Sequence, residues 1–146
     1  MNIFMNDLRI LVDQKETEKK HDIKIAVRVP SLPEDAIKWK LNPVYWAQKG
    51  YVDAIMPTNF DSYDNDIPVE VWKDKIGKGH EIMFLPGTSY FEYETSWGTG
   101  NRLSQTAEGL RAITVNACFR GGDGIYLYNF FNASDFNQKK LRKMVL

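Results

Sequence analysis

The chain has 146 residues, nineteen basic side chains against nineteen acidic ones, and 43% hydrophobic residues. This length suits one compact domain, so we expect a single domain over residues 1–146. The balanced charge provides no net field for phosphate backbones or anionic lipid, which argues against nucleic-acid and membrane partners. No apolar run approaches the roughly 20 residues of a spanning helix, and the N-terminus lacks the layout of a signal peptide. The sequence leaves the cellular compartment open.

The first expected element is an amphipathic helix from Met1 to about Lys20. Its apolar residues follow the i, i+4, i+7, i+8 spacing of one helical face, and they are Phe4, Leu8, Leu11 and Val12. A short apolar run over residues 23–29 then predicts a buried strand that ends at Pro30.

The next unit repeats this order of helix and strand. Ser31 and Glu34 have the spacing of a capping box, which predicts the start of a helix. Asn42 and Pro43, a cap residue followed by proline, restart the helix. We expect a second strand over residues 51–56.

The second half of the chain continues the pattern. The spacing predicts helices over residues 68–78 and 106–119 and a final basic helix over residues 137–145. Strands are expected over residues 81–85 and 125–130. Prolines at positions 57 and 86 are expected to end the second and third strands.

Strands that alternate with helices and read as continuous apolar runs predict an α/β protein with a parallel sheet. Four βα units correspond to half of a TIM-type (β/α)8 barrel, which has eight units and about 250 residues. An open flavodoxin-like sheet is the alternative. Against it, the first strand is followed by Pro30–Pro33 (PSLP) rather than by a glycine-rich phosphate loop.

Three segments resemble bacterial glycoside-hydrolase-like (β/α)8 barrel proteins. They are Ala26–Pro30 (AVRVP), Gly50–Pro57 (GYVDAIMP) and Gly122–Phe131 (GDGIYLYNFF), which resemble the fifth, sixth and eighth strands of that family. Thr106–Ala112 (TAEGLRA) resembles the helix before the eighth strand. The resemblance implies the C-terminal half of a barrel, in which the first four βα units are missing from this chain.

The resemblance also implies where catalytic carboxylates belong. Such barrels carry one after the fourth strand and one at the end of the seventh, because glycoside hydrolysis needs a pair. The fourth strand has no counterpart here, and the predicted seventh strand carries no carboxylate at its tip. Glu92 and Glu94, farther along the loop, are the remaining catalytic candidates.

The loops after the predicted strands combine aromatic rings with carboxylates and amides. Rings pack against pyranose C–H faces and polar groups bind hydroxyls, so these loops indicate a carbohydrate site. The alternative is a long loop packed by its own rings. The candidate carbohydrate-binding residues are Asn59, Asp61, Tyr90, Trp97 and Asn129.

Arg28 is the one charge inside the first apolar run. A buried arginine needs a partner, so it either points into the barrel mouth, near Asn59 and a carboxylate, or forms a structural ion pair. Asp61, Asp64 and Asp66 lack the glycine and distal glutamate of a calcium loop. We expect neither a metal nor another cofactor.

We therefore expect a half-barrel whose rim loops form part of a carbohydrate-binding cleft, with little or no hydrolase activity in the isolated chain. One alternative is a hydrolase assembled from two chains, with Glu92 or Glu94 as a carboxylate. The other is a non-catalytic structural module that recognises a carbohydrate or a protein. Four strands alone would expose two sheet edges, so a homodimer is also expected.

Overall fold

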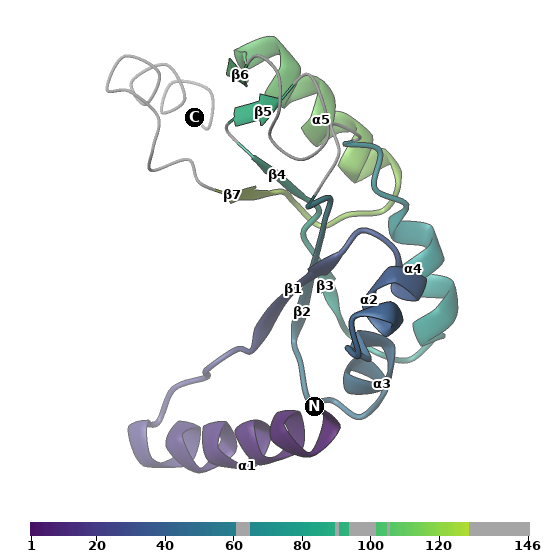
Figure 1. The fold of residues 1–146 in the computed structure, drawn as a ribbon. Helices are drawn as coiled ribbons and strands as arrows, with labels where there is room; N and C mark the ends of the chain where they lie inside the picture. The colour runs from purple at the N-terminus through teal and green to yellow at the C-terminus, as the bar shows by residue number, and fades with distance from the viewer. Residues whose placement is uncertain (61–64, 90, 94–101, 105, 129–146) are drawn as a thin grey trace.

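The structure is a computed structural model that describes residues 1–60, 65–89, 91–93, 102–104 and 106–128 (Figure 1). Its main element is a parallel sheet in the order β1-β2-β4-β7, in which β3 also pairs with β2. The strands are β1 (Ala26–Pro30), β2 (Ala54–Thr58), β3 (Met83–Phe84), β4 (Gly87–Ser89) and β7 (Tyr126–Tyr128). The prediction of a mixed α/β chain with a parallel sheet is confirmed.

Four helices lie along one side of this sheet in Figure 1: α2 (Pro33–Lys38), α3 (Pro43–Gln48), α4 (Val69–Ile76) and α5 (Ala107–Phe119). A separate antiparallel pair joins β5 (Phe91–Tyr93) to β6 (Arg102–Ser104) beyond the end of β4. The last predicted helix, over residues 137–145, lies outside the described residues.

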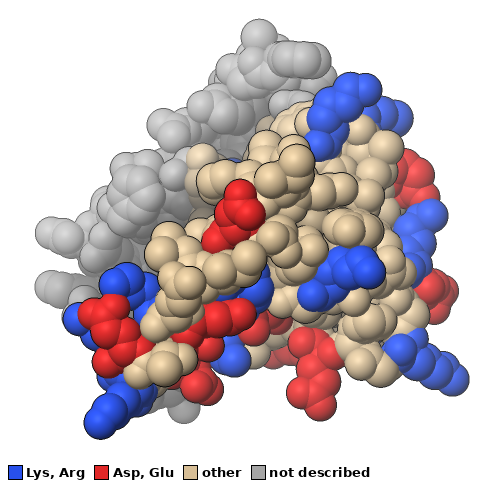
Figure 2. Space-filling view, turned by 90° about the horizontal axis from the view of Figure 1, so that it is seen from below, with Lys and Arg blue, Asp and Glu red and all other residues tan. Residues whose placement is uncertain are grey.

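The first helix, α1 (Asn2–Lys19), lies across the foot of the sheet, where the strands begin. Seen from this side, acidic and basic side chains are interspersed rather than gathered by sign (Figure 2). The residues of α1 that pack against the core are Met5, Leu8 and Val12. Phe4 and Leu11 were predicted on the same face, but they are 61% and 51% exposed. The predicted apolar stripe is therefore wider than the surface that the described residues cover.

The core lies between the sheet and the helices. Val29, Ile55 and Phe84 come from three adjacent strands and point toward the helices. Trp72 of α4 packs against them and is fully buried. Burying an aromatic ring of this size supplies more hydrophobic free energy than any single aliphatic residue, so Trp72 and Trp46, which is 3% exposed, are the two largest contributors.

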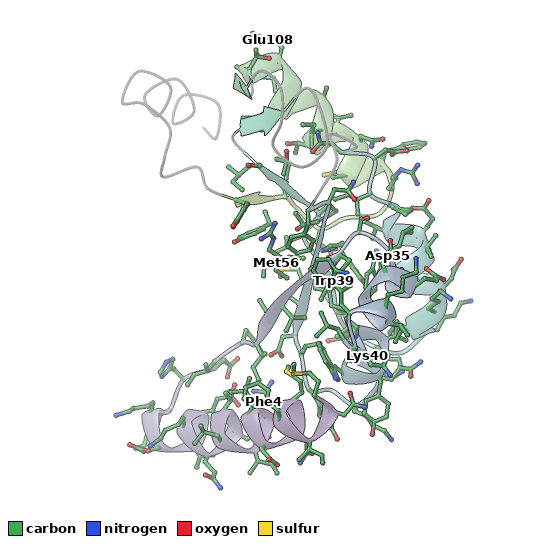
Figure 3. All side chains as sticks on the ribbon, in the orientation of Figure 1. Phe4, Asp35, Trp39, Lys40, Met56 and Glu108 are labelled. Atoms are coloured by element: carbon green, nitrogen blue, oxygen red, sulfur yellow. The ribbon has the colours of Figure 1, made fainter. Side chains whose placement is uncertain are left out.

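The opposite face of the sheet has no described helix over it. Arg28 and Met56 are register partners in β1 and β2, so their side chains share one face. Figure 3 shows Met56 on the side away from α2 and α3. We call this surface the open face.

Of the two predicted helix caps, the one at Asn42 is confirmed, and the structure adds a third cap at Thr106, which was expected only as the start of a helix. Asn42 accepts a hydrogen bond from Tyr45 N at 3.2 Å, and Thr106 accepts one from Gly109 N at 3.0 Å. The capping box from Ser31 is wrong: α2 begins at Pro33 and its N-cap is Leu32. A residue before proline is pushed out of the helical region, and Leu32 is extended with φ −116° and ψ 143°.

The first strand ends at Pro30 as predicted, whereas the strand end predicted at Pro57 is wrong, because β2 continues through Pro57 to Thr58. The third strand continues beyond Pro86 as β4 and ends at Ser89. Pro57 of β2 lies beside the gap between β3 and β4. Because proline has no backbone N–H, one hydrogen bond of the ladder is missing there, and pairing resumes between Thr58 and Gly87. The strand β4 therefore ends three residues before Glu92.

No helix in the described part of the chain is long and apolar enough to cross a membrane.

Gly87 allows β2 and β4 to approach closely. A Cβ atom there would overlap Thr58 Oγ1 and lie 3.2 Å from Thr58 Cβ. We predict that Gly87→Ala lowers the free energy of unfolding by about 1–3 kcal/mol, as overpacking does. Urea unfolding would measure this, and adding Thr58→Ala should recover part of the loss. An unchanged unfolding midpoint in the single variant would contradict the close approach.

Candidate functional site

A row of stacked side chains runs along the open face near the carboxyl ends of the strands. The Arg28 guanidinium carbon lies 4.1 Å from the Phe60 ring centroid and 3.7 Å from that of Tyr128. The Trp39 and Phe60 centroids are 5.2 Å apart, and those of Tyr126 and Tyr128 are 6.4 Å apart. We call these five residues the stacked row. It joins the C-cap of α2, β1, the loop after β2, and β7.

A hollow of roughly 240 Å³ adjoins one end of the stacked row. It lies where β1 and β2 end, and seven residues line it: Pro30, Ser31, Asp35, Trp39, Thr58, Asn59 and Phe60. Trp39 is 52% exposed and Phe60 is 39% exposed, so both rings offer apolar surface to a ligand. Hydroxyl, amide and carboxylate groups line the same hollow, which therefore combines flat apolar faces with hydrogen-bonding groups.

The core fixes the floor of this hollow. Trp72 Nε1 donates a hydrogen bond of 2.8 Å to the carbonyl oxygen of Ser31, which directly follows β1. Thr58, at the end of β2, is buried and donates to Met56 O at 3.2 Å. The Trp72 hydrogen bond fastens the end of β1 to the core, and the burial of Thr58 packs the end of β2, so the floor of the hollow is held in place.

Two of the predicted binding residues lie at this site. Asn59 lines the hollow and Arg28 belongs to the stacked row. The other predicted binding residues, together with Glu94, fall outside the described residues, and they are Asp61, Tyr90, Trp97 and Asn129. The structure therefore brings together the part of the predicted site that belongs to β1 and β2.

Arg28 takes up neither predicted arrangement completely. It is on the open face, but no ion pair of Arg28 forms within the described residues. Its charge is instead held against Phe60 and Tyr128. Cation–π contacts of this kind stabilise a partly desolvated guanidinium without an anionic partner.

Glu92 is described through its backbone alone. It belongs to β5 and pairs with Leu103 of β6. Because β4 ends at Ser89, Glu92 follows the strand end directly rather than lying far out on a loop. Its side chain and the residues around Glu94 lie outside what the structure describes.

Sequence reasoning missed Trp39, Phe60, Tyr126 and Tyr128. Trp39 stands between Lys38 and Lys40, and an exposed tryptophan between two lysines is a signal that the sequence did contain. Tyr126 and Tyr128 alternate along β7, which places them on one face. That they meet Arg28 depends on the strand order, which no local pattern reveals.

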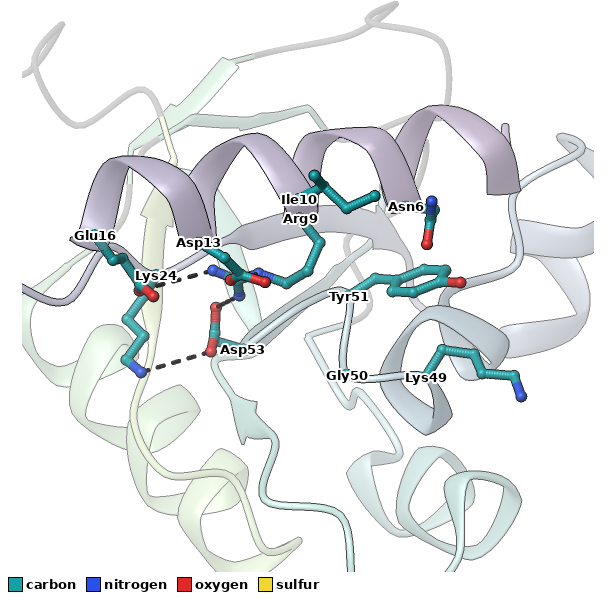
Figure 4. Close-up of a pocket in the computed structure, with 10 residues that line it drawn as sticks. All are labelled: Asn6, Arg9, Ile10, Asp13, Glu16, Lys24, Lys49, Gly50, Tyr51 and Asp53. Carbon is teal, nitrogen blue, oxygen red and sulfur yellow. Dashed lines mark hydrogen bonds and ion pairs between the residues drawn. The ribbon is translucent and has the colours of Figure 1, made fainter. Parts of the chain in front are cut away.

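A second hollow, of roughly 500 Å³, lies at the other end of the sheet, between α1 and the loop before β2 (Figure 4). Its charged groups bind one another. Arg9 forms ion pairs with Asp53 at 2.9 Å and with Asp13 at 2.8 Å, and Asp53 also accepts a 2.7 Å hydrogen bond from Ile25 N. These contacts fasten α1 to the sheet, so we assign this hollow a structural role.

A separate cluster of charged side chains joins α4 to α5. Arg120 binds both carboxylate oxygens of Asp66, and it also pairs with Glu70. These bonds from Arg120, together with one from Asn116, hold the pKa of Asp66 below its ordinary value. Since the lowered pKa belongs to the folded state, the resulting stabilisation is present at neutral pH and is lost as the pH falls through that pKa. This cluster also has a structural explanation.

Among the described residues, no group of three or more His, Cys, Asp and Glu side chains could hold a metal ion. The chain matches no known protein-family model and has no significant match among curated proteins. Any assignment of function therefore depends on the site itself.

Proposed function

We propose that the stacked row and the adjoining hollow form part of a carbohydrate-binding cleft. The observation that carries the proposal is the pair of exposed rings, Trp39 and Phe60, beside the polar groups at the ends of β1 and β2. A pyranose ring has an apolar C–H face that packs on an aromatic ring and a rim of hydroxyls that need hydrogen bonds. The hollow offers both kinds of contact within one small volume.

The cleft lies at the carboxyl ends of parallel strands, where ligands bind in α/β folds. We further propose that the sheet is half of a TIM-type barrel. The strands follow one another in chain order across the sheet, and the helices α2–α5 lie on one side of it. A flavodoxin-like sheet would place its first strand inside the sheet and helices on both faces.

An assembled hydrolase is the second candidate, and the position of Glu92 favours it. The residue follows the end of β4 within the β5–β6 pair, close in sequence to where a barrel of this kind carries a catalytic carboxylate. Hydrolysis requires a second carboxylate, and Asp35 is the one acidic residue in the described lining of the hollow. Its carboxylate is bound to Lys38 at 2.7 Å. Binding without turnover is therefore the function that we favour.

Trp39→Ala should weaken glycan binding about tenfold, because it removes the more exposed stacking surface and one such contact accounts for roughly this factor. Isothermal titration with glycans chosen from a broad panel would measure it. Ile37→Ala is the matched control, since Ile37 is 51% exposed on α2 and does not line the hollow. Equal affinity in the Trp39 variant and the wild type would overturn the proposed site.

Purified chain should release little or no product from aryl glycosides and oligosaccharides, because Asp35, the one carboxylate in the described lining of the hollow, is bound to Lys38 and hydrolysis needs a pair. If turnover is found, Glu92→Gln and Glu94→Gln decide its origin. A loss of several hundredfold in either variant, with unchanged unfolding, would establish the assembled hydrolase and overturn the prediction of inactivity.

We also propose self-association. Within the described sheet, β1 and β7 each pair on one side alone, and Phe4 and Leu11 of α1 are exposed. Unpaired edges and apolar surface favour contact with a second copy. Light scattering on a sizing column should give about twice 16.9 kDa at micromolar concentration. A monodisperse monomer that remains soluble would contradict this arrangement.

A further inference from the structure

Arg28 has the property expected of a ligand-binding cation rather than of a structural one. Its Nε atom is buried, and it has no hydrogen-bond partner in the described part of the chain. Arg9 of α1 also has a buried Nε atom without a hydrogen bond, but its charge is matched by ion pairs with Asp13 and Asp53. Because Nε is enclosed, a ligand would reach Arg28 through its two terminal nitrogens, which form no hydrogen bond or ion pair within the described residues.

The rings around Arg28 determine which of its groups remain for a ligand. Phe60 and Tyr128 both lie within about 4 Å of the guanidinium carbon, in contact with its flat surface. The five N–H donors of a guanidinium lie in its plane. An acceptor must therefore approach edge-on, and stacking holds the plane in place before the ligand arrives. A fixed planar fork of this kind matches a carboxylate, whose two oxygens accept two parallel hydrogen bonds.

Phe60 connects this fork to the sugar surface. Its ring contacts Arg28 on one hand and lies 5.2 Å from the ring of Trp39 on the other. The Trp39 and Phe60 rings are tilted by 41° to each other, so a pyranose stacked on Trp39 would contact Phe60 with one ring edge, on the side toward Arg28. A carboxyl group at C5 projects from that edge, so a uronic acid could stack and pair with the guanidinium at the same time.

We propose that the cleft selects carbohydrates that carry a carboxylate, and that Arg28 is the residue that binds this carboxylate. This inference depends on the proposed carbohydrate-binding function and adds the class of ligand to it. The acid group of a uronic-acid residue accepts from Arg28, while Trp39 and Phe60 hold the ring.

The test compares each acidic oligosaccharide with its own methyl ester, which keeps the sugar and removes the charge. Isothermal titration would use galacturonate and glucuronate oligosaccharides, their methyl esters, neutral glycans and a sulfated oligosaccharide. We expect at least one acid to bind about tenfold or more tightly than its ester. In Arg28→Gln the ratio of the two dissociation constants should fall close to one.

A second variant separates the planar fork from charge alone. Arg28→Lys keeps the positive charge but loses the planar fork, so it should lose most of the preference for the acid. A full preference in Arg28→Lys would show a simple charge effect and overturn the assignment of the fork. The wild-type comparison of acid and ester does not depend on whether either variant folds.

The remaining outcomes distinguish this inference from the function on which it depends. If acids and esters bind equally, or if neutral glycans alone bind, selection for acidic sugars is wrong while the carbohydrate cleft stands. If the sulfated oligosaccharide binds best, the carboxylate is the wrong anion. If no glycan binds at all, the proposed function itself fails, and this inference fails with it.

Discussion

The one-sided burial of the sheet is the constraint on which the rest of the structure depends. Val29, Ile55 and Phe84 all point toward the helices and pack with Trp72, so the strongest hydrophobic contacts lie on one face. Because side chains alternate along a strand, the residues between them must face the other way. Arg28 is one of these, and the same register that buries Val29 places Arg28 on the open face. The candidate site is thus a direct consequence of how the core is built.

Patterns that act over a few residues were predicted well. The alternation of helices and strands was correct, as was the cap at Asn42, because each depends on neighbouring residues alone. Local rules failed where two of them competed. The capping spacing at Ser31 predicted that the helix starts there, but Pro33 keeps the preceding residue, Leu32, out of the helical region, so the helix begins at Pro33. Pro57 was read as a stop, yet a proline removes one donor and leaves the alternate residues of the strand paired.

The site could be predicted only in part, because its contacts join distant parts of the chain. Arg28 and Asn59 were recognised from their places at the strands, whereas the stacking of Arg28 on Tyr128 brings together residues one hundred positions apart. An unmatched charge in an apolar run indicated that a partner was needed, and the natural expectation was a carboxylate. The described partners are aromatic rings instead, and their identity depends on the strand order β1-β2-β4-β7. Sequence reasoning could state the need for a partner but not its chemistry.

The most direct test of the carbohydrate cleft is an NMR titration that follows the tryptophan indole N–H signals. Trp39 lines the hollow, whereas Trp46 and Trp72 are buried in the core and donate to Asn2 and Ser31. With ¹⁵N-labelled protein and a glycan that binds, the Trp39 signal, assigned with Trp39→Phe, should shift progressively while those of Trp46 and Trp72 stay in place. A bound glycan that leaves the Trp39 signal unchanged would mean that the carbohydrate binds elsewhere, and would contradict the assignment of the cleft.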